Sequence, residues 1–108
     1  MSPDRADGPI GIFPGSFDPL TVAHLAVADA AVAHAGLVRL DLAVARRALG
    51  KEDGAHLPVA ERVAAIERAR RERPWLHAVV TDAALIADLA RGYDAVVMGA
   101  DKWAQVRD

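Results

Sequence analysis

The sequence predicts an α/β fold in which a parallel β-sheet has helices on both faces. Short apolar runs alternate with stretches that carry helix start and stop residues, in the order strand, helix, strand, helix, strand, helix, strand. This alternation requires right-handed crossovers between parallel strands. The 108 residues leave room for one small domain, and 53% of them are hydrophobic, which favours an ordered core. We place that domain at residues 9–108, behind a flexible tail at residues 1–8.

The first strand and the first helix have clear boundary residues. The apolar run Ile10–Phe13 is broken by Pro14-Gly15, which predicts a buried strand that ends in a turn. The segment Thr21–Ala35 is rich in alanine, the strongest helix former, and Gly36 follows it as a stop. Thr21 is a suitable N-cap for this helix.

The remaining elements repeat the same alternation. A polar loop, residues 46–56, separates the second strand from the second helix, and Pro58 suits the first position of that helix. Thr81 and Asp82 are predicted to cap the third helix, and Gly92 to close it. The predicted strands are Val38–Ala45, Leu76–Val80 and Ala95–Met98, and the predicted helices are Pro58–Arg73 and Ala83–Arg91.

Composition excludes several classes of function. The absence of cysteine excludes disulfides, thiolate metal sites and cysteine nucleophiles. A net charge of −2 gives no general attraction for nucleic acid or an anionic membrane. The polar N-terminus is unlike a secretory signal, and no apolar run approaches the roughly 20 residues that span a bilayer. We therefore expect a cytoplasmic protein whose partners are small molecules rather than nucleic acid or membrane.

The layout predicts a ligand site at the carboxyl ends of the strands. A glycine-bearing turn leads from the first strand into the first helix, where free main-chain N–H groups and the helix dipole favour an anion. Ser16 and Thr21 could add hydroxyl donors, and a phosphate would neutralise a protonated His24 in the first helical turn. The alternative is that His24 packs against the sheet while Ser16 caps a turn. The residues alone leave both interpretations open.

The stretch Gly11–His24, with Gly15-Ser-Phe-Asp-Pro19 followed by Thr21-Val-Ala-His24, resembles a known signature. It is similar to the G-[ST]-F-D-P and [HT]-x-G-H motifs of the cytidylyltransferase-like nucleotidyltransferase superfamily. The resemblance implies a Rossmann-like sheet with strand order 3-2-1-4. It also implies a reaction in which an acceptor phosphate attacks the α-phosphorus of ATP and pyrophosphate leaves, with Mg²⁺ carried mostly by phosphates and water.

Within the superfamily, two branches are similar to this chain. The segment Gly99-Ala-Asp101 resembles that of nicotinate or nicotinamide mononucleotide adenylyltransferases, whereas Thr21 resembles phosphopantetheine adenylyltransferases. We favour the mononucleotide branch, which implies nicotinate mononucleotide as the acceptor and a role in NAD biosynthesis. The other hypotheses are a different acceptor, such as phosphopantetheine or glycerol phosphate, and a nucleotide-binding module without catalysis.

The resemblance also implies a role for each matching residue. His24 would contact the α-phosphate with Thr21 beside it, and Asp101, after Gly99, would bind the ribose. The remaining candidates are phosphate-binding residues and one acceptor-stacking residue. They are Ser16 with the Gly15–Phe17 main chain, Asp18, Arg46, Arg47 or Lys51, and Trp103. Solvated loop charges for the basic residues, loop capping for Asp18 and cover of a sheet edge for Trp103 are the competing interpretations.

The chain departs from the superfamily pattern at two points. Ala23 replaces the motif glycine, so a methyl group could crowd a nucleotide and weaken or shift its binding. The later superfamily motif [IS]-S-[ST]-x-x-[RK], which grips the triphosphate, has no match in the 108 residues. The strand at Ala95–Met98 would then be an exposed edge. We therefore expect either a chain that lacks a C-terminal strand and helix, or a homo-oligomer that covers this edge.

Overall fold

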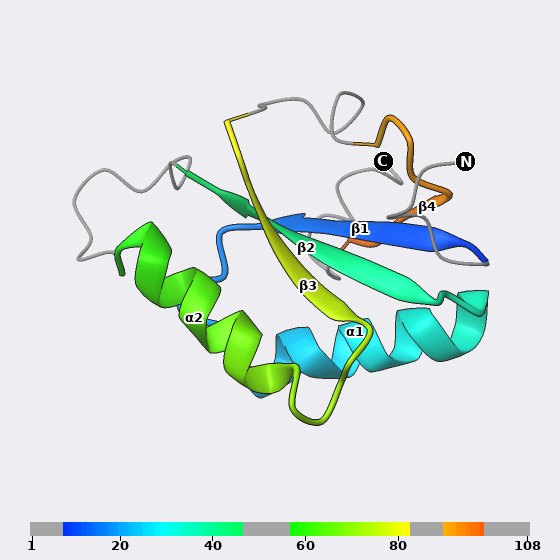
Figure 1. Cartoon of the computed structure of the whole chain (residues 1–108), viewed down its shortest axis with the longest axis horizontal. Helices are drawn as coiled ribbons and strands as arrows, with labels where there is room; N and C mark the ends of the chain where they lie inside the picture. Colours follow the sequence, from blue (N-terminus) through cyan, green and yellow to red (C-terminus); the bar gives the residue numbers. More distant parts are fainter. Residues whose placement is uncertain (1–7, 47–56, 83–89, 99–108) are drawn as a thin grey trace, which may run out of the picture.

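The computed structural model describes residues 8–46, 57–82 and 90–98, and it shows an α/β fold (Figure 1). Its elements are β1 (Ile10–Gly15), α1 (Val22–Ala35), β2 (Arg39–Ala45), α2 (Val59–Ala69), β3 (Leu76–Thr81) and β4 (Ala95–Val96). All the strand pairs are parallel, and the strand order is β3-β2-β1-β4. The predicted fold class and sheet order are confirmed.

The register of the sheet places the core on one face. Phe13 pairs with Leu42, and Leu42 pairs with Ala78, so the side chains of these residues point to the same side. Ala28 from α1 and Ile66 from α2 join the same buried cluster. Both helices therefore cover one face of the sheet, and Figure 1 shows them together below it.

The handedness of the crossovers explains this arrangement. The steps from β1 to β2 and from β2 to β3 move in the same direction across the sheet, so two right-handed crossovers put α1 and α2 on the same side. The step from β3 to β4 reverses direction, and a right-handed crossover there would pass over the other face. The helix predicted for that step, Ala83–Arg91, lies mostly outside the described residues, which omit 83–89.

The helix ends agree with the sequence at α1 and differ at α2. Thr21 caps α1, and Gly36 ends it in the left-handed conformation, with φ 64°. Pro58 is the N-cap of α2 instead of its first helical residue, and α2 ends at Ala69 instead of Arg73. The reason for the early end is a tightened last turn, in which main-chain N–H groups donate to the third residue before them.

Two further boundaries predicted from the sequence are wrong. The third strand ends at Thr81 and not at Val80, and the Thr81 carbonyl accepts a hydrogen bond from the main-chain N–H of Arg46 at 2.9 Å. Pairing with Ala45 extends β3 to this residue, and the helix that Thr81 and Asp82 are predicted to cap lies mostly outside the described residues. The fourth strand covers Ala95–Val96 and does not extend to Met98.

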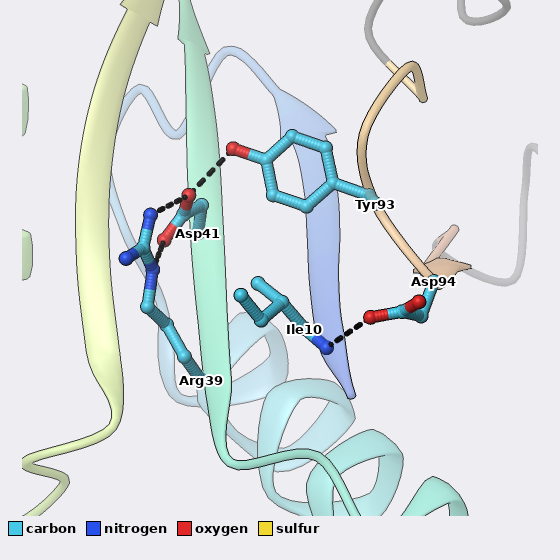
Figure 2. Close-up of polar contacts among 5 residues, drawn as sticks. All are labelled: Ile10, Arg39, Asp41, Tyr93 and Asp94. Atoms are coloured by element: carbon cyan, nitrogen blue, oxygen red, sulfur yellow. Dashed lines mark hydrogen bonds and ion pairs between the residues drawn. The ribbon is translucent and has the colours of Figure 1, made fainter. Parts of the chain in front are cut away.

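A buried polar network occupies the sheet face opposite the helices (Figure 2). The Asp41 side chain is fully buried and accepts hydrogen bonds from the Arg39 guanidinium at 2.8 and 3.0 Å and from the Tyr93 hydroxyl at 2.5 Å. Burial alone would raise the pKa of Asp41, but the hydrogen bonds from Arg39 and Tyr93 lower it overall. Burial, followed by the bond to Asp41, raises the pKa of Tyr93 to about 12.

The same network fixes the start of β4 against β1. Tyr93 and Asp94 immediately precede β4, and the Asp94 carboxylate accepts a hydrogen bond from the Ile10 main-chain N–H at 2.8 Å. The Asp94 N–H in turn donates to the Ile10 carbonyl at 2.8 Å. Side-chain contacts to β1 and β2 thus position a strand that is itself only two residues long.

Candidate functional site

The turn between β1 and α1 is built around the ring of Phe17. Phe17 has φ 50°, a left-handed conformation that is uncommon for a bulky residue, and the residue as a whole is 1% exposed. Its ring meets Phe13 and His24 edge-on, with centroids 5.2 and 5.0 Å apart. A Cβ on Gly15 would lie only 3.1 Å from the Phe17 ring. Glycine at position 15 therefore lets the ring pack against the strand end, and the ring supports His24.

Thr21 and His24 form a reciprocal cap at the start of α1. The Thr21 hydroxyl accepts a hydrogen bond from the His24 main-chain N–H at 3.3 Å, and the Thr21 N–H donates to His24 Nδ1 at 3.0 Å. This arrangement is a capping box in which histidine takes the place that glutamate or glutamine usually occupies. It places the imidazole in the first turn of the helix.

The cap also defines which ring nitrogen of His24 carries the proton. Because Nδ1 accepts a hydrogen bond, the neutral ring holds its proton on Nε2. Burial lowers the pKa of His24 below its usual value of 6.5, which favours this neutral form. His24 is half-buried beside Phe17 and is not enclosed in the interior. Its chemistry is that of an oriented, neutral N–H donor.

The main chain of the same turn offers further donors. Within the described residues, the N–H groups of Ser16 and Phe17 donate to no protein acceptor. Such groups at a left-handed bend before a helix start are typical of anion-binding turns. Asp18 has another role, since its carboxylate accepts a hydrogen bond from the Leu57 N–H at 2.8 Å and links the turn to the start of α2.

Arg62 is the residue at this site that the sequence analysis missed. It lies on α2, is 3% exposed, and donates to the Ser16 and Ala45 carbonyls at 2.9 Å and to the Leu57 carbonyl at 3.0 Å. A signal was present in the sequence, because Arg62 precedes Ile66 by four residues and so shares its core-facing side of the helix. A buried cation thus lies beneath the carboxyl ends of β1 and β2.

Arg46 is the described member of the predicted basic group. It follows β2, and its side chain is 58% exposed and forms an ion pair with Asp82, just after β3, at 2.8 Å. The pair lies at the same carboxyl edge of the sheet as the β1–α1 turn. An exposed pair of this kind contributes little to stability, so Arg46 can exchange Asp82 for another anion at low cost.

Five of the predicted site residues lie outside the part of the chain that the structure describes. They are Arg47, Lys51, Gly99, Asp101 and Trp103. In the described ranges no group of three or more His, Asp or Glu side chains is arranged to hold a metal ion. The helices within these ranges are also too short or too polar to cross a membrane.

Comparison with known proteins identifies the family. A family model described as cytidylyltransferase-like matches residues 12–108, which include the β1–α1 turn, His24 and Arg62. No curated protein matches the chain. The matched range covers nearly the whole sequence. The chain therefore belongs to the cytidylyltransferase-like family, and its function is of the nucleotidyltransferase type.

Proposed function

We propose that this protein transfers the AMP moiety of ATP to a phosphate-bearing acceptor, with nicotinate mononucleotide as the preferred candidate. The observation that carries the proposal is the Thr21–His24 cap, which orients a neutral Nε2–H donor beside a turn whose main-chain N–H groups have no acceptor among the described residues. Donors fixed in this way stabilise charge that develops on a phosphate without having to reorganise during the reaction.

The proposed reaction needs the protein to align the two substrates, and it needs no covalent intermediate on the protein. A lone pair of the acceptor phosphate forms a bond to the α-phosphorus of ATP. The bond from that phosphorus to the bridging oxygen breaks, and pyrophosphate leaves with the electron pair. No proton has to be removed from the attacking oxygen, because it is already ionised. Alignment of the two substrates can supply several kcal/mol, up to roughly 7–11 in the best intramolecular models.

Each part of the site has a place in this proposal. His24 Nε2–H would contact the α-phosphate, and the N–H groups of Ser16 and Phe17 would bind a phosphate of the nucleotide or the acceptor. Arg46 would exchange Asp82 for the acceptor phosphate. ATP would enter as its Mg²⁺ complex, with the ion held mainly by the phosphates and water, in keeping with its reluctance to dehydrate. Asp101 would bind the ribose, with Gly99 beside it, and Trp103 would stack on the acceptor ring.

A panel of substrates tests the proposal. We expect pyrophosphate release with ATP and nicotinate mononucleotide, and less or none with CTP, phosphopantetheine or glycerol phosphate. His24→Ala should lower kcat at least roughly a hundredfold, as removal of a comparable donor does. His34→Ala, an exposed histidine in the last turn of the same helix, is the matched control and should leave kcat unchanged. Turnover only with CTP or only with another acceptor would contradict the specificity proposed.

A second candidate is a nucleotide-binding module without catalysis. Ala23 favours it, because this residue is exposed in the first turn of α1, where the superfamily motif has glycine. Its methyl group would reduce the space next to a bound phosphate. ATP binding in calorimetry with no pyrophosphate release from any acceptor would support this candidate. Recovery of turnover in Ala23→Gly would show that the methyl group is the cause.

A further inference from the structure

The buried guanidinium of Arg62 joins three separate segments at the carboxyl edge of the sheet. Its Nη1 donates to the carbonyls of Ser16, after β1, and Ala45, at the end of β2. Its Nε donates to the carbonyl of Leu57, just before α2. The contacts to Ser16 and Ala45 are 2.9 Å long, and that to Leu57 is 3.0 Å. One side chain therefore fixes the relative positions of the β1–α1 turn, the β2 end and the α2 start.

The described hydrogen-bond partners of Arg62 are main-chain carbonyl groups, which are dipoles and carry no net charge. None of the ion pairs formed among residues 8–46, 57–82 and 90–98 involves Arg62. Burial of a charge is costly unless it is compensated, and carbonyl oxygens solvate the cation without cancelling it. Because no carboxylate of the described residues pairs with the guanidinium, its positive charge remains below the turn. An anion above the turn would gain from it in this poorly solvated region.

The contact to Ser16 also determines where the next N–H group points. In a planar trans peptide, the C=O of one residue and the N–H of the next point in opposite directions. Because Arg62 holds the Ser16 carbonyl on the α2 side, the Phe17 N–H is directed away from α2. This N–H has no acceptor among the described residues. The buried cation thus orients an unpaired donor of the turn.

We infer that Arg62 is a positioning residue for nucleotide phosphates: by binding the Ser16 carbonyl from below, it aims the Phe17 N–H at a bound phosphate and adds positive charge beneath it. The inference rests on the proposed function, since it needs a phosphate ligand at the β1–α1 turn. It does not depend on catalysis or on the identity of the acceptor. Arg62 itself touches no substrate.

Calorimetry with ATP and with adenosine, which lacks the phosphates, tests the inference. Arg62→Lys keeps the charge, but a single ammonium group cannot reproduce the guanidinium fork. We expect Arg62→Lys to weaken ATP binding roughly tenfold or more, the loss of a hydrogen bond to a charged group, and to change adenosine binding less than about twofold. Arg73→Lys is the matched control, because Arg73 forms its bidentate pair with Asp29 on α1, away from the turn. It should leave both affinities unchanged.

The outcomes separate positioning from simple structural support. An equal loss of ATP and adenosine affinity in Arg62→Lys, or no loss of either, would overturn the inference. If Arg62→Lys does not fold, the wild-type protein still provides the test through its Phe17 amide NMR signal. We expect inorganic tripolyphosphate to shift this signal, and saturation without a shift would overturn the inference. ATP binding that depends on Arg62 without pyrophosphate release would reject the proposed catalysis alone. No binding of any phosphate ligand would reject both.

Discussion

The contact between Gly15 and the Phe17 ring gives the sharpest test of how this site is built. In Gly15→Ala the new methyl carbon would lie 3.1 and 3.2 Å from two ring atoms, whereas ordinary contacts begin at 3.4 Å. The ring therefore has to retreat by about 0.3 Å, the difference between 3.4 and 3.1 Å. Because the ring is buried against Phe13 and His24, overpacking should cost about 1 kcal/mol, the low end of the usual range.

The same displacement should reach the imidazole. Because a small shift of the ring weakens the contact between His24 and a phosphate without removing it, ATP binding should fall by less than the roughly tenfold that loss of a hydrogen bond to a charged group costs. Urea unfolding measures the stability change, calorimetry measures the affinity, and imidazole NMR signals report the position and tautomer of His24.

Gly36→Ala is the matched control for this experiment. Gly36 has φ 64° with nothing within 4 Å of an added Cβ, so alanine there costs about 1–2 kcal/mol in backbone strain at the far end of α1. We expect a similar loss of stability with unchanged ATP affinity. Wild-type stability and an unchanged His24 signal in Gly15→Ala would refute the packing argument. Equal affinity losses in both variants would show that global stability, and not the ring, controls binding.

Three further changes test the cap and the buried network. Tyr93→Phe removes a hydrogen bond to a buried carboxylate, so the free energy of unfolding should fall by about 1.5–3 kcal/mol, measured in urea; a loss below about 0.5 kcal/mol would contradict the role given to Asp41. Thr21→Val removes the hydroxyl of the cap and should cost about 1 kcal/mol, while NMR spectra should show the same His24 tautomer because the main-chain N–H still donates to Nδ1; a second tautomer in this variant would contradict the tautomer assignment from the main-chain contact. The pKa of His24 in the folded protein lies below 6.5, so the unfolded chain binds more protons than the folded protein as the pH falls. The stability that His24 contributes is therefore present above about pH 6.5 and is lost as the pH falls through the folded pKa. The urea midpoint of His24→Gln should depend less on pH than that of the wild type, and an identical pH dependence would contradict the lowered pKa.

The strands and the first helix were predictable because their signals are local. Alternating side chains, apolar runs and punctuating Gly and Pro residues act within a few positions of the chain, and they located β1, α1 and β2 to within two residues. The last residue of β3 was not predictable in this way. It depends on where β3 pairs with β2, and that is a contact between residues distant in sequence.

The sequence predicted where the site lies, but not which contacts hold its residues in place. The turn and His24 follow from the strand-to-helix boundary and the superfamily motif. The cap between Thr21 and His24 has the three-residue spacing of a capping box, yet histidine is unusual in that position. The Arg62 contacts join residues up to 46 positions apart, and no local pattern could reveal their partners.

The two buried charged side chains of the described core differ in a way that bears on function. Asp41, on the face opposite the helices, has its charge neutralised by Arg39 and accepts a further hydrogen bond from Tyr93, so no net charge remains in this network. Arg62 meets only main-chain dipoles in the described part of the chain, so its charge is solvated but not neutralised. A fold that needed Arg62 for packing alone would gain from a carboxylate beside it, because an unpaired buried charge is destabilising. The positive charge remains at the edge of the sheet where the turn presents its N–H groups. A bound phosphate is the partner that would neutralise it.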